Sequence, residues 1–290
     1  MHWVDSLDES AERAVGELLT AAREADGHPE EAVAPRGGLH LLAYDADALV
    51  GYTHLDTAGD AFGRQVAELV VHPGHRRHGV GTALARALIA KVPAKLRVWA
   101  HGDHPAAARI AEHEGFKRVR ELLVMHTPAR DDWPEPVLSQ GVSLRTFAPG
   151  RDEQAVIEVN ARAFDWHPEQ GSLTAAELRD TETEDWFDPA GFFLAEREGR
   201  IVGFHWTKVH PPHPRRFGGA AVGEVYVVGV DPGAQGGGLG KALTTAGLRY
   251  LRERGLGQII LYVEADNAAA IAVYSRLGFT RYQSDIQYEH

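Results

Sequence analysis

The segment Gln235-Gly236-Gly237-Gly238-Leu239-Gly240 combines residue types and spacing that point to a specific kind of chemistry. It follows an apolar stretch and opens a stretch whose apolar residues recur at helical spacing. Glycines let the backbone approach a bulky anion, and the N-terminus of a helix presents free N–H groups and the positive end of its dipole. The loop is therefore predicted to bind phosphate groups.

Two other kinds of phosphate-binding loop are disfavoured. A P-loop, G-x-x-x-x-G-K-[ST], needs Gly at position 235 and Ser or Thr at position 242, where Gln235 and Ala242 stand. A dinucleotide-binding loop fits poorly, because the preceding strand is fed by a hairpin and no acidic residue ends a second βα unit at the expected distance.

Composition narrows the class of protein. The chain has no cysteine, which excludes disulfides, thiolate–metal sites and a cysteine nucleophile, and its sixteen histidines are too scattered to suggest a metal. A formal charge of −11 argues against nucleic acid as a partner, although the basic run at 75–78 can hold a phosphorylated small molecule. With no membrane-spanning stretch and no secretory signal at the acidic N-terminus, a cytoplasmic location is expected. The protein is also expected to be a monomer.

The chain repeats itself. Four residues of the segment 66–84 recur 159 positions later, pairing Val71, Pro73, Gly79 and Gly81 with Val230, Pro232, Gly238 and Gly240. A second match, between 103–116 and 266–279, has an offset of 163. The extra four residues correspond to one helical turn in the second copy. We therefore expect two copies of one domain.

The elements that position the loop alternate between strand and helix. In the second copy we expect a hairpin of strands 191–197 and 201–209, strand 224–230, a helix over 239–255 that ends at Gly255, strand 259–265, a helix from Asp266 or Asn267 to Arg276, and a last strand over 280–288. Strand 142–147 opens this copy, and 40–55 is the hairpin of the first. The proline-rich segment 128–136 is predicted to link domains 1–134 and 135–290. The fold class is α/β with a mixed sheet.

Two motifs carry a resemblance to a known family. The pattern V-x-P-x-x-[RQ]-x-x-G-x-G, followed after the next strand by N-x-x-A-x-x-x-Y-x-x-x-G-F, resembles the GCN5-related N-acetyltransferases (GNAT), over roughly 40–126 and 142–288. The resemblance implies two tandem acetyl-CoA-binding domains. Each would have a mainly antiparallel sheet that splays in the middle, with helices on both sides and the thioester in the gap.

The resemblance also implies which residues contact acetyl-CoA. In the second half these are Val228, Gly229, Val230, Gln235, Gly236, Gly237, Gly238, Leu239, Gly240, Lys241, Asn267, Ala268, Ala269, Ala270, Ile271 and Ala272. In the first half they are Leu69, Val70, Val71, Arg77, His78, Gly79, Val80, Gly81 and Thr82.

The blocks FDWHPEQG (164–171) and GFHWTKVHP (203–211) resemble, more narrowly, tandem members that acetylate the cysteinyl amine of a cysteine–glucosamine–inositol conjugate. The substrate contacts thereby implied are Glu30 (or Glu31), Glu169, Lys208, Glu224 and Tyr262. Two alternatives remain open. One is acetylation of another amine, on an aminoglycoside, a polyamine or a protein N-terminus, and the other is a non-enzymatic acyl-CoA sensor.

Direct acetyl transfer needs a base, a donor for the departing thiolate, and N–H groups for negative charge on oxygen. Glu224, at the start of a strand, is the expected base, acting directly or through a water. Tyr274, two helical turns after Asn267, is the expected acid, and the N–H of Val228 or Val230 the oxyanion donor. Each also has an ordinary structural explanation: a strand-end carboxylate, a core aromatic and, for Asn267, a helix N-cap.

The offsets predict that the first half has lost catalysis. They place Gln65 at the position of Glu224, His104 at that of Asn267 and Ala111 at that of Tyr274. Glu68 lies three residues beyond Gln65, on the other face of the strand. Since R-x-x-G-x-G persists from Arg76, this half is expected to bind acyl-CoA without using it.

Overall fold

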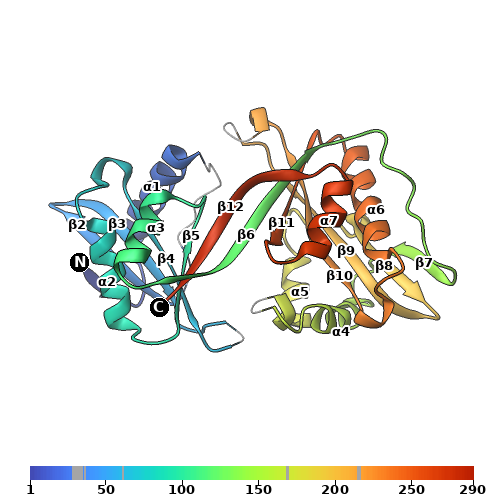
Figure 1. Ribbon diagram of the computed structural model, residues 1–290, viewed down its shortest axis with the longest axis horizontal. Helices are drawn as coiled ribbons and strands as arrows, with labels where there is room; N and C mark the ends of the chain where they lie inside the picture. The colour runs from blue at the N-terminus through green and yellow to red at the C-terminus, as the bar shows by residue number, and fades with distance from the viewer. Residues whose placement is uncertain (28–34, 36, 61, 168–169, 214–216) are drawn as a thin grey trace. The chain divides into compact units, whose positions relative to one another are not determined.

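The computed structural model describes residues 1–27, 35, 37–60, 62–167, 170–213 and 217–290. The chain forms two compact units (Figure 1). Unit 1 contains Met1–Leu123, Glu264–Asp266 and Gln283–His290, and unit 2 contains Val124–Val263 and Asn267–Tyr282. These units differ in two ways from the expected domains 1–134 and 135–290. The change of unit falls at 123/124, and the last eight residues return to unit 1.

Unit 1 holds a mostly antiparallel sheet with helices on both faces. Its strands, in spatial order, are β1 (His2–Val4), β2 (Leu39–Asp45), β3 (Ala48–Asp56), β4 (Gln65–Val71), β5 (Leu96–Ala100) and the C-terminal part of β12 (Thr280–Glu289). The helices are α1 (Glu9–Asp26), α2 (Val80–Lys91) and α3 (Pro105–His113), with the short 3₁₀ turn η1 (Pro73–His75). Only β4 and β5 pair in parallel among the strand pairs with a described register in this unit.

Unit 2 has the same order when it is read from its other edge, with β7 at the position of β1 and β6 at that of β12. Its strands are β6 (Lys117–Pro128, from Val124), β11 (Gln258–Glu264), β10 (Val222–Val230), β9 (Arg200–His210), β8 (Phe192–Arg197) and β7 (Val142–Thr146). The helices are α4 (Glu153–Ala163), α5 (Ala175–Thr181), α6 (Leu239–Glu253) and α7 (Ala268–Arg276). The 3₁₀ turns are η2 (Gln170–Ser172), η3 (Pro189–Gly191), η4 (Phe217–Gly219) and η5 (Pro232–Ala234). The expected two-domain α/β architecture is confirmed.

Successive side chains of a strand point to opposite faces of the sheet, and in unit 2 apolar side chains on both faces pack against helices. On β8, Phe192 and Leu194 pack in one cluster with Val156 and Val159 of α4. Ala195, on the opposite face, packs with the Leu239 and Leu243 side of α6. Burying each large side chain of this kind stabilises the fold by about 1.5–3 kcal/mol.

Two local predictions, the hairpin turn and the end of the long helix, are confirmed, whereas the segment 128–136, predicted as a linker, lies within unit 2. The hairpin turns at Glu198 and Gly199, both with positive φ, and α6 ends just before Gly255, whose φ is 81°. Helix α6 has 15 residues against 12 in α2, which explains most of the growth in the offset. The proline-rich segment packs on unit 2, since Trp133 is buried and its Nε1 donates to the carbonyl of Leu277 at 3.0 Å.

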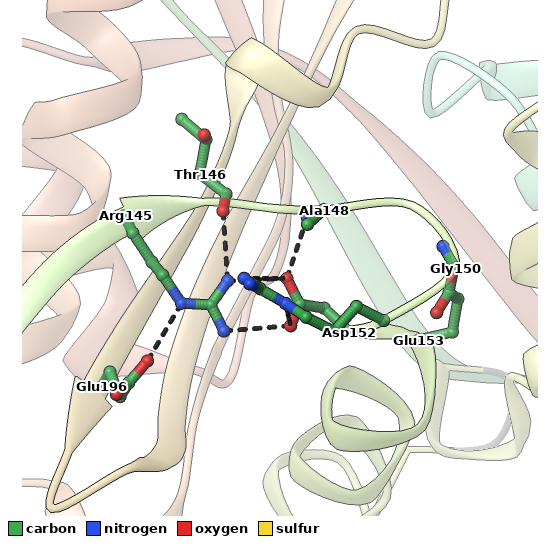
Figure 2. Close-up of polar contacts among 8 residues, drawn as sticks. Arg145, Thr146, Ala148, Gly150, Asp152, Glu153 and Glu196 are labelled. Atoms are coloured by element: carbon green, nitrogen blue, oxygen red, sulfur yellow. Dashed lines mark hydrogen bonds and ion pairs between the residues drawn. The ribbon is translucent and has the colours of Figure 1, made fainter.

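An ion-pair cluster fixes α4 against the strands of unit 2 (Figure 2). The guanidinium of Arg145 on β7 donates to both carboxylate oxygens of Asp152 at 2.6 and 2.9 Å, and to Glu196 on β8 at 2.9 Å. Burial raises the pKa of Asp152, but hydrogen bonds from Arg145, Arg151 and the N–H of Ala148 outweigh it and hold the pKa at about 2. Asp152 immediately precedes α4, so this carboxylate ties the start of the helix to the sheet.

Candidate functional site

A gap opens in unit 2 where β10 and β11 part. They pair in parallel only from Gly223 to Val225 on β10, whereas β10 continues to Val230. On its other edge β10 remains paired with β9, and the N–H of Asp231 donates to Val202 at 3.0 Å. Since hydrogen bonding alternates along an antiparallel ladder, the N–H groups of Val228 and Val230 point toward the open edge. They are placed to bond an extended ligand or a developing oxyanion.

The predicted phosphate loop lies at the end of this strand. Gly238 caps α6 in the left-handed conformation (φ 77°) without a side-chain hydrogen bond. The first-turn N–H groups, which have no intrahelical partners, are therefore left for a ligand. The amide of Gln235 donates to the carbonyl of Val230 at 3.2 Å, which fixes the loop against the strand. This geometry fits the pyrophosphate of acetyl-CoA.

Glu224 lies on β10 directly before the gap and is only 5% exposed. Its Oε2 is 2.6 Å from Nε2 of His210, which stands diagonally across on β9. With Glu224 ionised, this bond requires a proton on Nε2. Sequence reasoning singled out Glu224 but missed His210. The signal that could have found it is the alternation Lys208–His210, which places both side chains on the strand face that carries Glu224.

Aromatic rings surround the ammonium group of Lys208, which lies opposite Glu224 in the ladder. Its Nζ is 4.2 Å from the ring centre of Trp186 and 5.2 Å from that of Tyr226. Tyr226 is the extra residue of a β-bulge in β10. Burial, followed by the negative charge of Glu224, raises the pKa of Tyr226. The bulge thus brings a polar aromatic side chain to the site.

Helix α7 carries the predicted acid. Asn267 caps the helix by accepting from the N–H of Ala270 at 3.1 Å, so its N-cap explanation is confirmed. Residues 268–272 form the start of the helix. Burial raises the pKa of Tyr274 to about 12, and in the described part of the chain its hydroxyl makes no hydrogen bond. The phenol is therefore protonated and available as a donor.

Tyr262 follows Leu261, the last β11 residue paired with β10, and thus lies where the strands part. Lys208 and Glu224, also expected to contact substrate, are brought together, as described above. Three other residues named from sequence, Glu30, Glu31 and Glu169, lie outside the described residues.

The loop of unit 1 shares its glycine cap and its contact with the preceding strand with the loop of unit 2. Gly79 caps α2 with φ 83°, and Nε of Arg76 donates to the carbonyl of Val71 at 3.2 Å, as Gln235 does to Val230. Beside the loop, Arg77 adopts a positive φ of 67°. Parallel pairing of β4 with β5 ends at Glu68, which leaves 69–71 with an open edge. Both units therefore combine a glycine-capped helix N-terminus with an open strand edge.

Unit 1 carries different residues at the positions that correspond to Glu224, Asn267 and Tyr274. The N-cap of α3 is His104, which accepts from the N–H of Ala106 at 3.1 Å, and Ala111 is a core residue packed with Ile286. β4 pairs with β3 without a bulge. Because β10 has one extra residue, the residue that occupies the position of Glu224 in the strand pairing of unit 1 is Val66, whose partner on β3 is Asp56. The sequence offset gives Gln65, one position earlier. Neither residue is a carboxylate.

An ionic cluster occupies the strand ends of unit 1 instead. His101, just after β5, lies 3.6 Å from Glu68 on β4 and 3.1 Å from Asp285 on β12. Burial lowers the pKa of His101, but hydrogen bonds to Asp285 and Glu68 outweigh it and raise the pKa to about 10. The imidazole is thus a cation held between two carboxylates, not a free base.

Among the described residues, no group of three or more His, Cys, Asp or Glu side chains is arranged to hold a metal ion. Nor does any helix within these ranges have the length and apolar character needed to cross a membrane.

Comparisons with known proteins agree on one family. The sequence model of the Acetyltransferase (GNAT) family matches residues 4–125 and again residues 160–279. The mycothiol acetyltransferase of Amycolatopsis mediterranei is 60% identical over 99% of this chain and 97% of its own length. That of Saccharomonospora viridis is 61% identical, with the same coverage of both chains.

Solved structures show the same fold at low identity. A GCN5-related N-acetyltransferase from Sphaerobacter thermophilus aligns with a TM-score of 0.70 at 23% identity, covering 99% of this chain and 95% of the other. A tandem GNAT protein from the clavulanic acid biosynthesis pathway aligns with a TM-score of 0.69 at 21% identity, covering 100% and 98%.

Proposed function

Because this chain belongs to the Acetyltransferase (GNAT) family, we propose that it is a mycothiol acetyltransferase. It transfers the acetyl group of acetyl-CoA to the cysteinyl amine of desacetylmycothiol, a cysteine–glucosamine–inositol conjugate, and releases mycothiol and CoA. The observation that carries this proposal is 60–61% identity, over nearly the full chain, to two mycothiol acetyltransferases. The cytoplasmic location and the monomeric state expected from sequence stay predictions.

The residues of unit 2 divide the chemistry between them. Acetyl-CoA supplies the acetyl group as an activated thioester. The first-turn N–H groups of α6 hold its pyrophosphate, and the open edge of β10 aligns its pantetheine arm. Glu224 takes a proton from the substrate ammonium, directly or through a water, so that the nitrogen can attack. The N–H of Val228 or Val230 stabilises the negative charge that develops on the thioester oxygen.

Tyr274 supports departure of the thiolate. A thiol has an ordinary pKa of about 8.5. A phenol with a pKa of about 12 therefore stabilises the leaving sulfur chiefly by donating a hydrogen bond. Lys208, with Tyr262 and Glu169, contacts the sugar–inositol part of the substrate. The rings of Trp186 and Tyr226 hold the Lys208 ammonium in place for that contact.

Unit 1 binds acyl-CoA without transferring the acetyl group. This assignment is supported by a loop that matches that of unit 2 in its caps and its strand contact. It is also supported by the absence of a carboxylate at both Gln65 and Val66 and of a phenol at Ala111.

The direct test is acetyl transfer by the purified protein to desacetylmycothiol, followed by mass spectrometry of the product and by release of free thiol. An aminoglycoside, a polyamine and a peptide N-terminus serve as competing acceptors. We expect kcat/KM for desacetylmycothiol to exceed that for each of the others by at least about a hundredfold. Wild-type protein that prefers another amine, or that transfers to none, overturns the proposal.

A further inference from the structure

Acetylation of an ammonium releases a proton that must leave the site. When an ammonium and a thioester become an amide and a thiol, the nitrogen loses two protons. The thiol sulfur retains one of them, and the other goes to solvent. Glu224, as the base, must therefore lose a proton once per turnover. Its side chain is only 7% exposed, which makes direct release to bulk water unfavourable.

His210 is positioned to receive that proton. Its Nε2 is 2.6 Å from Oε2 of Glu224, and its side chain is 24% exposed, more than three times the exposed fraction of its partner. The two strands hold the pair rigidly, because β9 and β10 are in continuous register from Val222 to Val225, opposite His210 to Thr207. The contact thus joins a buried carboxylate to a group that water can reach.

The other titratable groups beside Glu224 cannot take this role. The Nζ of Lys208, opposite Glu224 in the ladder, lies against the rings of Trp186 and Tyr226, and an ammonium has no lone pair to accept a proton. Tyr226 keeps its own proton because its pKa is raised. Tyr262, on β11, is likewise a phenol. An imidazole, by contrast, accepts a proton on one nitrogen and releases one from the other near neutral pH.

We propose that His210 is a positioning residue that orients Glu224 and relays its proton to solvent after each acetyl transfer. In the ground state Nε2–H donates to Oε2. Once Glu224 has taken the substrate proton, the imidazole changes tautomer through solvent: Nδ1 takes a proton from water and Nε2 gives its own to water, with no net transfer. Nε2 then accepts the proton of the Glu224 carboxyl while Nδ1 releases one to water. Glu224 is again a carboxylate, His210 is again a neutral imidazole with its proton on Nε2, and the substrate proton has reached solvent. No oxidant or other co-reactant is needed. This inference rests on the proposed role of Glu224 as base.

The test compares His210→Gln, His210→Ala and a matched control, His126→Gln. Gln keeps an N–H donor for Glu224 but cannot carry a proton, whereas Ala removes both functions. His126 also bonds a side chain of unit 2, that of Gln258, but has no contact with Glu224 among the described residues. We expect kcat of His210→Gln to fall by about tenfold or more. KM for acetyl-CoA should stay unchanged, and added imidazole should restore a large part of the kcat lost in His210→Ala.

The outcomes separate this inference from the proposed function. Full kcat in His210→Gln overturns the relay, as does an unrescued His210→Ala or an equal loss in His126→Gln. If the wild type prefers another amine, the same variants are compared on that amine, so the relay is still tested although the proposed substrate is wrong. Wild-type protein that acetylates no amine overturns both.

Discussion

The two units build a glycine loop of the same kind beside different side chains. Gly79 and Gly238 both cap a helix in the left-handed conformation, and Arg76 and Gln235 both donate to the last carbonyl of the preceding strand at 3.2 Å. The guanidinium of Arg76 and the carboxamide of Gln235 are different groups, but each makes this same contact in its own unit. The requirement maintained in both units is therefore the shape of the loop.

The strands that lead into these loops differ by one residue. β10 has a bulge at Tyr226, whereas β4 pairs with β3 without interruption. Before its bulge, β10 carries Glu224 next to His210, and the counterpart of His210 in unit 1 is Ala58, beyond the end of β3. The glycine loop and the side chains beside it thus differ independently between the two units.

The largest expected effect concerns the base. Glu224→Gln should lower kcat by about a thousandfold, because general base catalysis contributes about 10²–10⁴. Binding of acetyl-CoA should be unaffected, since the loop and the open edge of β10 are unchanged. Steady-state kinetics and calorimetric titration check the two quantities.

A substitution that adds a carboxylate to unit 1 is the control for the one that removes it from unit 2. Val66→Glu places a carboxylate at the ladder counterpart of Glu224, but Ala111 still stands where Tyr274 would be needed. We expect no activity from unit 1 when Val66→Glu is combined with Glu224→Gln. Recovered turnover would contradict the assignment of catalysis to unit 2 alone.

The next effect concerns Tyr274. Tyr274→Phe should lower kcat by about a hundredfold, because it removes the hydrogen-bond donor to the leaving sulfur but keeps the ring. The variant and the wild type are to be compared on a series of acetyl thioesters whose leaving thiols differ in pKa. The loss should shrink as the thiol becomes more acidic. A loss that is independent of the leaving group would indicate a packing role against Phe279, whose ring centre is 5.9 Å away.

Sequence predicted the elements well because each one is locally encoded. The Gly255 helix end, the Asn267 cap and the Glu198–Gly199 turn all follow from single residues with strong conformational preferences. The bulge at Tyr226 did not follow, since it depends on the register with β9, and it moved the counterpart of Glu224 from Gln65 to Val66. His210 was missed for the same reason, because its contact with Glu224 is made across strands.

The sequence also could not predict that the last eight residues return to unit 1. An offset relates copies along the chain and cannot tell which unit a strand joins. Asp285 meets His101 across 184 positions, so no local pattern predicts the ionic cluster in which His101 lies between Glu68 and Asp285.

A smaller effect concerns the stability of unit 2, to which the ion pair of Asp152 contributes in a pH-dependent way. The pKa of Asp152 is about 2 in the folded state and 3.8 without its partners. A lowered pKa stabilises the fold above the unfolded value, so this contribution, about 2 kcal/mol, is present above pH 4 and is lost as pH falls toward 2. Asp152→Asn should therefore destabilise unit 2 at pH 7 and make little difference near pH 2.

Hydrogen exchange resolved by segment measures this in α4 and, as an internal reference, in α1 of unit 1. The matched control is Asp131→Asn, which removes an Arg–Asp pair of similar length (2.7 Å) whose carboxylate is 92% exposed. That pair should contribute less than about 1 kcal/mol. Equal losses from the two substitutions would show that burial of Asp152 is not what makes its pair stabilising.

The smallest effect tests the loops themselves. Gly238→Ala and Gly79→Ala each force a side chain into a left-handed conformation where no neighbour lies within 4 Å of the added Cβ. The cost is therefore backbone strain, about 1 kcal/mol, which should weaken acetyl-CoA binding about fivefold in that unit alone. We expect two binding events in the wild type, and only Gly238→Ala should raise KM. A rise in KM from Gly79→Ala would mean that the first loop takes part in turnover, and the loops would then share a function as well as a shape.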